Sequence, residues 1–351
     1  MDAGRLGLIV NKQVRTKGLG LKEFLARKRN AALVGDNSSG IVSDLVGDSV
    51  VVSGEKKKKE ENRTMSKYLC TFSGKFGDIL WSLPTAKFIS ERIVNARVDF
   101  ATMPYYQTLL PLLVEQSYIE NAFVMESWLR THSNHGDQPW QPPENAEVAT
   151  TLYESCWHLG YRAHPGISAP SMPLLQFVAY QQGIQLPAEY GTNFIDVSDQ
   201  PAEEAYKIMF SSGSMEQVIK ENRLVTYSFN EQYKEQKQRF QEALWSIGNK
   251  EGFEFFNVGE VGWKEAAWLI KKSLVYVGCR SANWVLANGV GKKTITYEPH
   301  PSRHKACHLG PVFGNPFGSE FALPFNMSES LAAETTVSLM KKMREEMGVS
   351  V

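Results

Sequence analysis

The sequence has few cysteines, no excess of either charge and no long apolar run. Its 4 cysteines are widely spaced over 351 residues with no C-x-x-C pair, which disfavours a disulfide framework and a zinc module. Lys+Arg and Asp+Glu both number 38, so no net field is available to attract nucleic acid or an anionic membrane. No uninterrupted apolar stretch reaches about 18 residues, so we expect no transmembrane helix. We therefore expect a reduced, cytoplasmic protein without specific nucleic-acid binding, and peripheral membrane contact stays open.

Residues 1–64 differ in composition from the rest of the chain. They carry 13 Lys+Arg against 8 Asp+Glu, and Phe24 is their only aromatic residue. This segment offers too little apolar area to offset the entropy of ordering it alone. Three interpretations stay open. We favour a disordered or loosely docked basic arm over a targeting peptide or an upstream extension before a natural start at Met65.

From Lys67 onward, short apolar runs alternate with stretches of helical spacing. The pattern predicts strands over 68–73, 98–102, 122–125, 224–229, 253–258, 274–278 and 294–297. It predicts helices over 79–95, 107–116, 171–182, 232–247, 264–271, 282–288 and 328–347. Such alternation indicates an α/β protein whose parallel sheets are joined by crossover helices.

Two runs of this kind predict two Rossmann-like domains, over 65–200 and 201–327, followed by a closing helix over 328–351. In open parallel sheets, ligands bind at the carboxyl ends of the strands. We therefore expect the sheets to face each other across a cleft that holds the functional site.

The first motif, Gly74-Lys75-Phe76-Gly77-Asp78, follows the first predicted strand and opens the first helix. Its glycines allow a sharp turn and a close approach of the backbone to a ligand. Asp78 would stand at the helix N-terminus on the side of the cleft, where it is either a helix cap or a reactive carboxylate. The glycine spacing fits neither a dinucleotide fingerprint nor a P-loop.

The second motif, Val277-Gly278-Cys279-Arg280-Ser281-Ala282-Asn283, joins a buried strand to a short helix. The N-terminus of that helix offers unbonded N–H groups and the positive end of its dipole to a diphosphate. Arg280 would add a charged, two-point contact. The alternative is an ordinary crossover with an arginine at its surface.

Together the two motifs resemble glycosyltransferase family 9, which includes the ADP-heptose:lipopolysaccharide heptosyltransferases and has the two-domain GT-B fold. The first motif is similar to the "Gly-Asp-hydrophobic … Leu-Pro" segment of the family, here Gly77-Asp78-Ile79 and Leu83-Pro84. The second aligns without a gap to a family segment after a buried strand, and it matches at Val277, Gly278, Ser281, Leu286, Ala287, Gly291, Lys292 and Thr294.

The resemblance implies an inverting glycosyltransferase of lipopolysaccharide biosynthesis, with Asp78 as general base. Residues 65–200 would bind a glycan or other hydroxyl acceptor, with Gly74, Lys75 and Gly77 on the acceptor side. Residues 201–327 would bind the nucleotide-sugar donor, and neither a metal nor a further cofactor would be needed.

Three departures from the family segment leave the donor sugar open. Arg280 stands where the family has Asp, Val285 where it has His, and Ala282 where it has Gly. Two alternatives therefore stay open: a nucleotide-sugar epimerase on the same scaffold, and a non-catalytic nucleotide-sugar or glycan-binding protein.

Further candidates complete the predicted donor site. We expect donor contacts from residues after the strands and from one later loop: Ser228, Lys234, Glu260, Arg280, Ser281, Ala282, Asn283 and Arg303. A solvated helix face is the alternative for Lys234 and Lys237. His300, His304 and His308 fit a loop better than a metal site, and Trp128, His132, His135 and Trp140 are either acceptor contacts or loop anchors.

Overall fold

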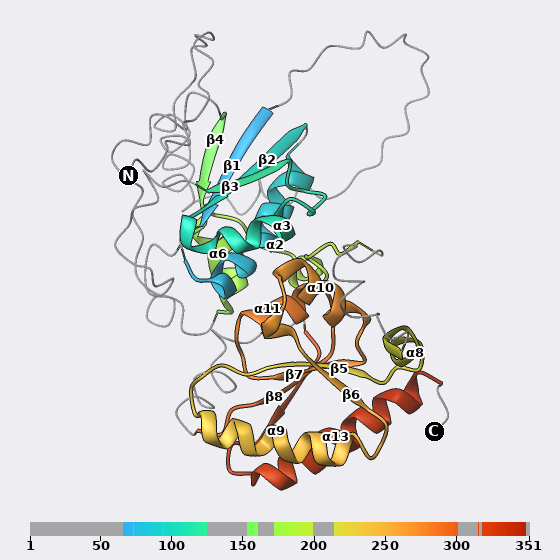
Figure 1. Ribbon diagram of the computed structural model, residues 1–351. Coiled ribbons are helices and arrows are strands. Elements are labelled where there is room, and N and C mark those ends of the chain that lie inside the picture. The colour runs from blue at the N-terminus through green and yellow to red at the C-terminus, as the bar shows by residue number, and fades with distance from the viewer. Residues whose placement is uncertain are drawn as a thin grey trace, which may run out of the picture.

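The computed structural model describes residues 66–72, 74–93, 95–124, 153–160, 172–198, 214–300, 315 and 318–348. Within these ranges the chain forms two lobes, each built on a parallel sheet with helices against it (Figure 1). The expected arm over 1–64 lies outside the described residues. So do these candidate residues: Trp128, His132, His135, Trp140, Arg303, His304 and His308. No helix in the described ranges has the length and apolar character needed to cross a membrane.

The first lobe is a four-stranded sheet in the order β3-β2-β1-β4, with every pair parallel. Its strands are β1 (Ser66–Phe72), β2 (Ala96–Thr102), β3 (Asn121–Val124) and β4 (Ser155–His158). Its helices are α2 (Phe76–Arg92), η2 (Pro104–Leu109), α3 (Leu110–Leu113), α6 (Leu174–Gln181) and η3 (Ala188–Gly191). β1 is central and its last five residues are buried, so the turn after it starts from a rigid position.

The second lobe is a five-stranded parallel sheet in the order β6-β5-β7-β8-β9. Its strands are β5 (Leu224–Ser228), β6 (Glu254–Asn257), β7 (Val275–Gly278), β8 (Thr294–Tyr297) and β9 (Glu320–Leu323). Its helices are α8 (Ser214–Lys220), α9 (Lys234–Gly248), η4 (Val258–Glu260), α10 (Trp263–Lys272), α11 (Ala282–Gly289) and α13 (Glu329–Glu346). α9 and α13 cover the outer face of the sheet, while α10 and α11 face the first lobe (Figure 1).

The alternation predicted from the sequence is confirmed. The structure adds α8 and the short 3-10 helices η3 and η4, which the pattern did not indicate, and it differs in two further respects. The prediction of one helix over 107–116 is wrong, because the structure has a 3-10 helix, η2, followed by the single α-helical turn α3. Pro104 and Pro111 explain this, because proline donates no backbone hydrogen bond and favours the first turn of a helix. The strands β4 and β9, which the apolar pattern did not indicate, are short and carry half-buried or exposed residues.

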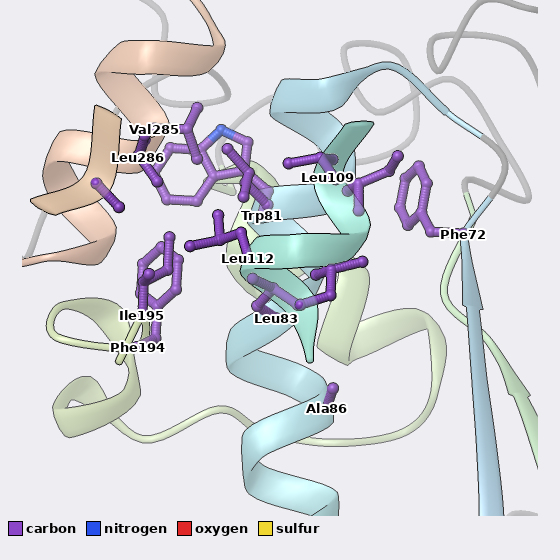
Figure 2. Close-up of a cluster of buried hydrophobic side chains, with 14 of the residues drawn as sticks. Phe72, Trp81, Leu83, Ala86, Leu109, Leu112, Phe194, Ile195, Val285 and Leu286 are labelled. Atoms are coloured by element: carbon purple, nitrogen blue, oxygen red, sulfur yellow. The ribbon is translucent and has the colours of Figure 1, made fainter. Parts of the chain in front are cut away.

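One hydrophobic core cluster spans both lobes, and a second lies within the second lobe. Figure 2 shows Trp81 of α2 beside Leu286 of α11, with Phe194 and Ile195 of the connecting segment against them. The backbone of the same segment is hydrogen-bonded to both lobes. The Tyr118 hydroxyl of the first lobe donates to the Phe194 carbonyl (2.6 Å), and the Ile195 N–H donates to the Gly289 carbonyl of the second lobe (2.9 Å). The relative position of the lobes is therefore held by both packing and hydrogen bonds.

Replacing Phe194 by Ala should lower the free energy of unfolding by about 3–5 kcal/mol, because a fully buried ring would leave a cavity between the lobes. Urea unfolding followed by tryptophan fluorescence and far-ultraviolet circular dichroism should show a single coincident transition. Tyr180→Ala, at a side chain 63% exposed, is the control and should cost less than about 0.5 kcal/mol. Two separated transitions in the wild type would show that the lobes do not share a core.

Candidate functional site

The two sequence motifs face each other across one pocket between the lobes. The turn that opens α2 and the turn that opens α11 line a pocket of about 410 Å³, with Trp81, Tyr106 and Trp284 as aromatic walls. The lining includes Lys75, Gly77 and Asp78 from the first lobe and Arg280, Ser281 and Ala282 from the second. Both turns follow the carboxyl ends of central parallel strands, so the sheet topology brings them to the same place.

Gly77 lies where α2 comes close to α11 in the pocket wall. A Cβ atom built on Gly77 would lie 3.5 Å from the Ala282 Cα and 3.7 Å from the Val285 Cγ2. These are ordinary van der Waals distances, so the space between the two helices at Gly77 is about one methyl group wide. Behind this contact, the Trp81 and Trp284 ring centroids lie 5.6 Å apart at an interplanar angle of 71°, which is a favourable edge-to-face arrangement.

Asp78 lies in the first turn of α2, two residues after its start at Phe76. The N-cap residue is Lys75, whose backbone is extended, so Asp78 does not occupy the capping position that a local interpretation gives it. The positive end of the helix dipole stabilises a carboxylate in this turn. Asp78 is half-buried and lines the pocket, where its carboxylate can meet a ligand.

Tyr106 is a neighbour of Asp78 that the sequence motifs did not reveal. Its pKa is raised by burial and, to a smaller extent, by the negative charge of Asp78. Its ring meets Phe76 edge-on at 4.9 Å. Tyr106 follows β2 just as the first motif follows β1, and that position at the carboxyl edge of the sheet is the signal that would have singled it out.

The N-terminus of α11 has donor groups to offer. Its N-cap, Ser281, has an extended backbone and makes no side-chain capping hydrogen bond. Within the described ranges, no residue accepts a hydrogen bond from the N–H of Ala282 or Asn283. The Asn283 side chain donates to the Ser228 hydroxyl (3.0 Å), which ties the start of α11 to the end of β5. These two N–H groups are suited to an anion.

Arg280 lines the pocket, but its charge is already balanced inside the protein. Its Nε donates to Oε1 of Glu320 (2.8 Å) and its Nη2 donates to Oε2 of the same carboxylate. The guanidinium also lies over the Trp284 ring at 4.9 Å. A direct two-point contact with a phosphate, as expected from the sequence, would have to compete with Glu320.

The other predicted donor residues fall into two groups. Ser228, Asn283 and the loop with Gly259 and Glu260 lie together: a Cβ on Gly259 would be 3.5 Å from the Ser228 Oγ, and the Asn257 side chain donates to Glu260 (2.7 Å). Lys234 is not among the residues that line the main pocket. It is paired with Glu231 at 3.1 Å and lines a separate hollow of about 300 Å³ at the start of α9.

Two other sequence expectations concern lysine and histidine. The solvated position considered for Lys237 is wrong, because its side chain is 2% exposed and donates to Asn230 (2.5 Å). Lys292, a family-matched residue, donates to the Ser273 carbonyl at the end of α10 (2.5 Å), and burial lowers its pKa to about 8.

His300 stacks on Tyr233 at 4.4 Å. In the part of the chain that the structure describes, no three His, Cys, Asp or Glu residues are grouped to hold a metal ion.

Comparison with solved structures identifies the fold. A glycosyltransferase family 9 protein from Veillonella parvula DSM 2008 superimposes with a TM-score of 0.55 at 10% identity, covering 80% of this chain and 97% of that one. The chain has the GT-B fold. Two E. coli proteins match less well: ADP-heptose lps heptosyltransferase II (TM-score 0.49, 13% identity, 81% and 100% covered) and heptosyltransferase WaaC with ADP (0.49, 9%, 79% and 99%). No family model and no curated protein sequence matches the chain.

In this GT-B protein, Gly77 provides a test of the contact between the pocket walls. Gly77→Ala should change the free energy of unfolding by less than about 1 kcal/mol, because the added methyl meets its neighbours at ordinary distances. Gly77→Val should lower it by about 1–3 kcal/mol, because two further methyl groups would push α2 away from α11. Chemical denaturation compares the two variants directly, and equal stability would show that the helices are not in contact at this point.

Proposed function

We propose that this protein transfers a sugar from a nucleotide-diphosphate sugar to a hydroxyl acceptor, in the pocket between α2 and α11. One observation carries the proposal: Asp78 and the uncapped N-terminus of α11 line the same pocket from opposite lobes. Displacing a diphosphate from a sugar requires a base for the incoming hydroxyl and a site for the outgoing anion. The pocket offers one of each, on facing walls.

In the proposed reaction, the Asp78 carboxylate accepts the proton of the acceptor hydroxyl as its oxygen bonds to the anomeric carbon. The bond from that carbon to the diphosphate oxygen breaks, and the nucleoside diphosphate leaves with the electron pair. A single displacement of this kind inverts the anomeric centre. The proton acceptor is the carboxylate form of Asp78, which the positive end of the α2 dipole stabilises.

The N–H groups of Ala282 and Asn283 are proposed to hold the diphosphate, with the dipole of α11 behind them. They are fixed before the charge develops, and preorganised donors stabilise a leaving anion most effectively. Ser281 and Ser228 would contact the phosphates beside them, and Glu260 would reach the ribose hydroxyls from its exposed loop. This arrangement assigns the leaving-group charge to the protein, without a metal.

The acceptor side is proposed to be the mouth of the pocket on the first lobe. Gly74 and Gly77 have no side chains to fill the space at this turn, and the Lys75 side chain beside them is exposed. The resemblance of the two motifs to glycosyltransferase family 9 makes a cell-envelope glycan, glycosylated in the cytoplasm, the first acceptor to test.

Asp78→Asn should lower the rate of acceptor-dependent sugar transfer by about 10²- to 10⁴-fold, because the amide cannot accept the hydroxyl proton. Nucleotide-sugar affinity should change by less than about threefold, since the variant is isosteric. The measurement is nucleoside diphosphate release from a panel of ADP-, GDP- and UDP-sugars, with and without cell-envelope extract. Glu334→Gln on the exposed surface of α13 is the control.

Unchanged release by the Asp78→Asn variant would contradict the proposed base. Formation of an epimer or a free sugar without acceptor would indicate an epimerase on the same scaffold instead. Donor binding without any turnover, in the wild type and across the panel, would indicate a binding protein.

A further inference from the structure

Arg280 and Glu320 form a nearly buried, bidentate ion pair beside the pocket. Their side chains are 8% and 11% exposed. Glu320 belongs to β9, the edge strand, and its Oε1 also accepts a hydrogen bond from the Thr296 hydroxyl on β8 (2.6 Å). The hydrogen bond from β8 thus orients the Glu320 carboxylate. This carboxylate in turn holds the Arg280 guanidinium against the Trp284 ring.

A second buried pair lies next to the first and balances in the same way. The Glu298 side chain, which is fully buried, accepts a hydrogen bond from the Arg280 backbone N–H (3.1 Å) and lies 3.9 Å from the Lys237 ammonium. Two cations therefore face two carboxylates beneath the start of α11, and the charges of these four side chains sum to zero. Among the described residues of the α11 wall, the remaining attraction for an anion comes from backbone N–H groups.

We propose that Glu320 is a specificity-determining residue that holds Arg280 and cancels its charge, so that the diphosphate is recognised by the N–H groups of α11. This rests on the proposed function. A guanidinium that left Glu320 for a phosphate would strand a buried carboxylate, which is strongly unfavourable. Arg280 therefore stays with Glu320 and shapes the wall through Trp284.

The neutral pair has a consequence for turnover. The diphosphate of a nucleotide-sugar is a diester, whereas the released nucleoside diphosphate ends in a monoester and carries about one more negative charge at neutral pH. An uncompensated arginine would favour the product over the donor by Coulomb attraction. A neutral wall reduces that preference, so it protects the enzyme from inhibition by its own product.

Three variants that remove charge test this assignment: the isosteric Glu320→Gln, Arg280→Met and the double variant. ADP, GDP, UDP and inorganic pyrophosphate are titrated by calorimetry, and the nucleotide that binds the wild type is used throughout. Glu320→Gln should bind it about tenfold more tightly, with a steeper salt dependence, and Arg280→Met should bind it about tenfold more weakly. The double variant should return to within about threefold of the wild type. In turnover, Glu320→Gln should lower the product inhibition constant more than the KM for the donor.

If Arg280 instead contacts phosphate directly, the double variant will bind as weakly as Arg280→Met, and that result overturns the inference. Circular dichroism and thermal unfolding show whether Arg280→Met folds. If it does not, Glu320→Gln alone still tests the inference, because this variant must bind the nucleotide more tightly than the wild type. Lys341→Met and Glu251→Gln remove the same charges from the pair at the far edge of the sheet (2.7 Å) and should leave binding unchanged. A wild type that binds none of the four probes contradicts the proposed function itself, whereas wild-type binding without rescue contradicts only the role of Glu320.

Discussion

The packing of α2 against α11 is the contact on which the candidate site depends. Each helix begins at the carboxyl end of a central strand, and the Gly77–Ala282 approach and the Trp81–Trp284 pair hold the two beginnings together. Both N-termini therefore point their positive dipole ends toward one pocket. A carboxylate and an anion site can lie within the same small volume because each is stabilised by its own helix. The two motifs would not line the same pocket if the lobes met at another face.

Beneath the pocket, the second lobe keeps charged groups in its interior at a cost. In a buried ion pair, the cost of desolvating both charges can exceed the gain from their attraction, so such pairs are weak evidence for stability. Here the Arg280–Glu320 and Lys237–Glu298 pairs join β7, β8, β9 and α9 directly below the start of α11. Their geometry fixes the backbone at Arg280 through the Glu298 carboxylate. Their clearest physical effect is therefore on the shape and charge of the pocket wall.

Much of the fold could be predicted from the sequence, because buried parallel strands such as β5 and β7 read as short apolar runs between helical stretches. Both pocket-lining turns could also be predicted, since glycines and polar residues there interrupt that pattern. The partners of their side chains could not. Glu320 lies 40 residues after Arg280 and pairs with it only through the β8–β9 register. Lys237 belongs to a helix rich in charged residues, where nothing local indicates that Asn230 and Glu298 give it buried partners.

The fixed arrangement of the lobes also limits how a donor can lie under the proposed function. The pocket volume of about 410 Å³ is at the lower end of the range of roughly 300–1,000 Å³ for small-molecule sites, and the approach of Gly77 to Ala282 narrows one wall. With the diphosphate on α11 and the sugar toward Asp78, the nucleoside has to extend over the carboxyl ends of β5 and β6. Ser228 and Glu260 lie at those strand ends, and Asn283 connects Ser228 to α11. The same hydrogen bond that orders the end of β5 therefore aligns the nucleoside surface with the N–H groups that hold the phosphates.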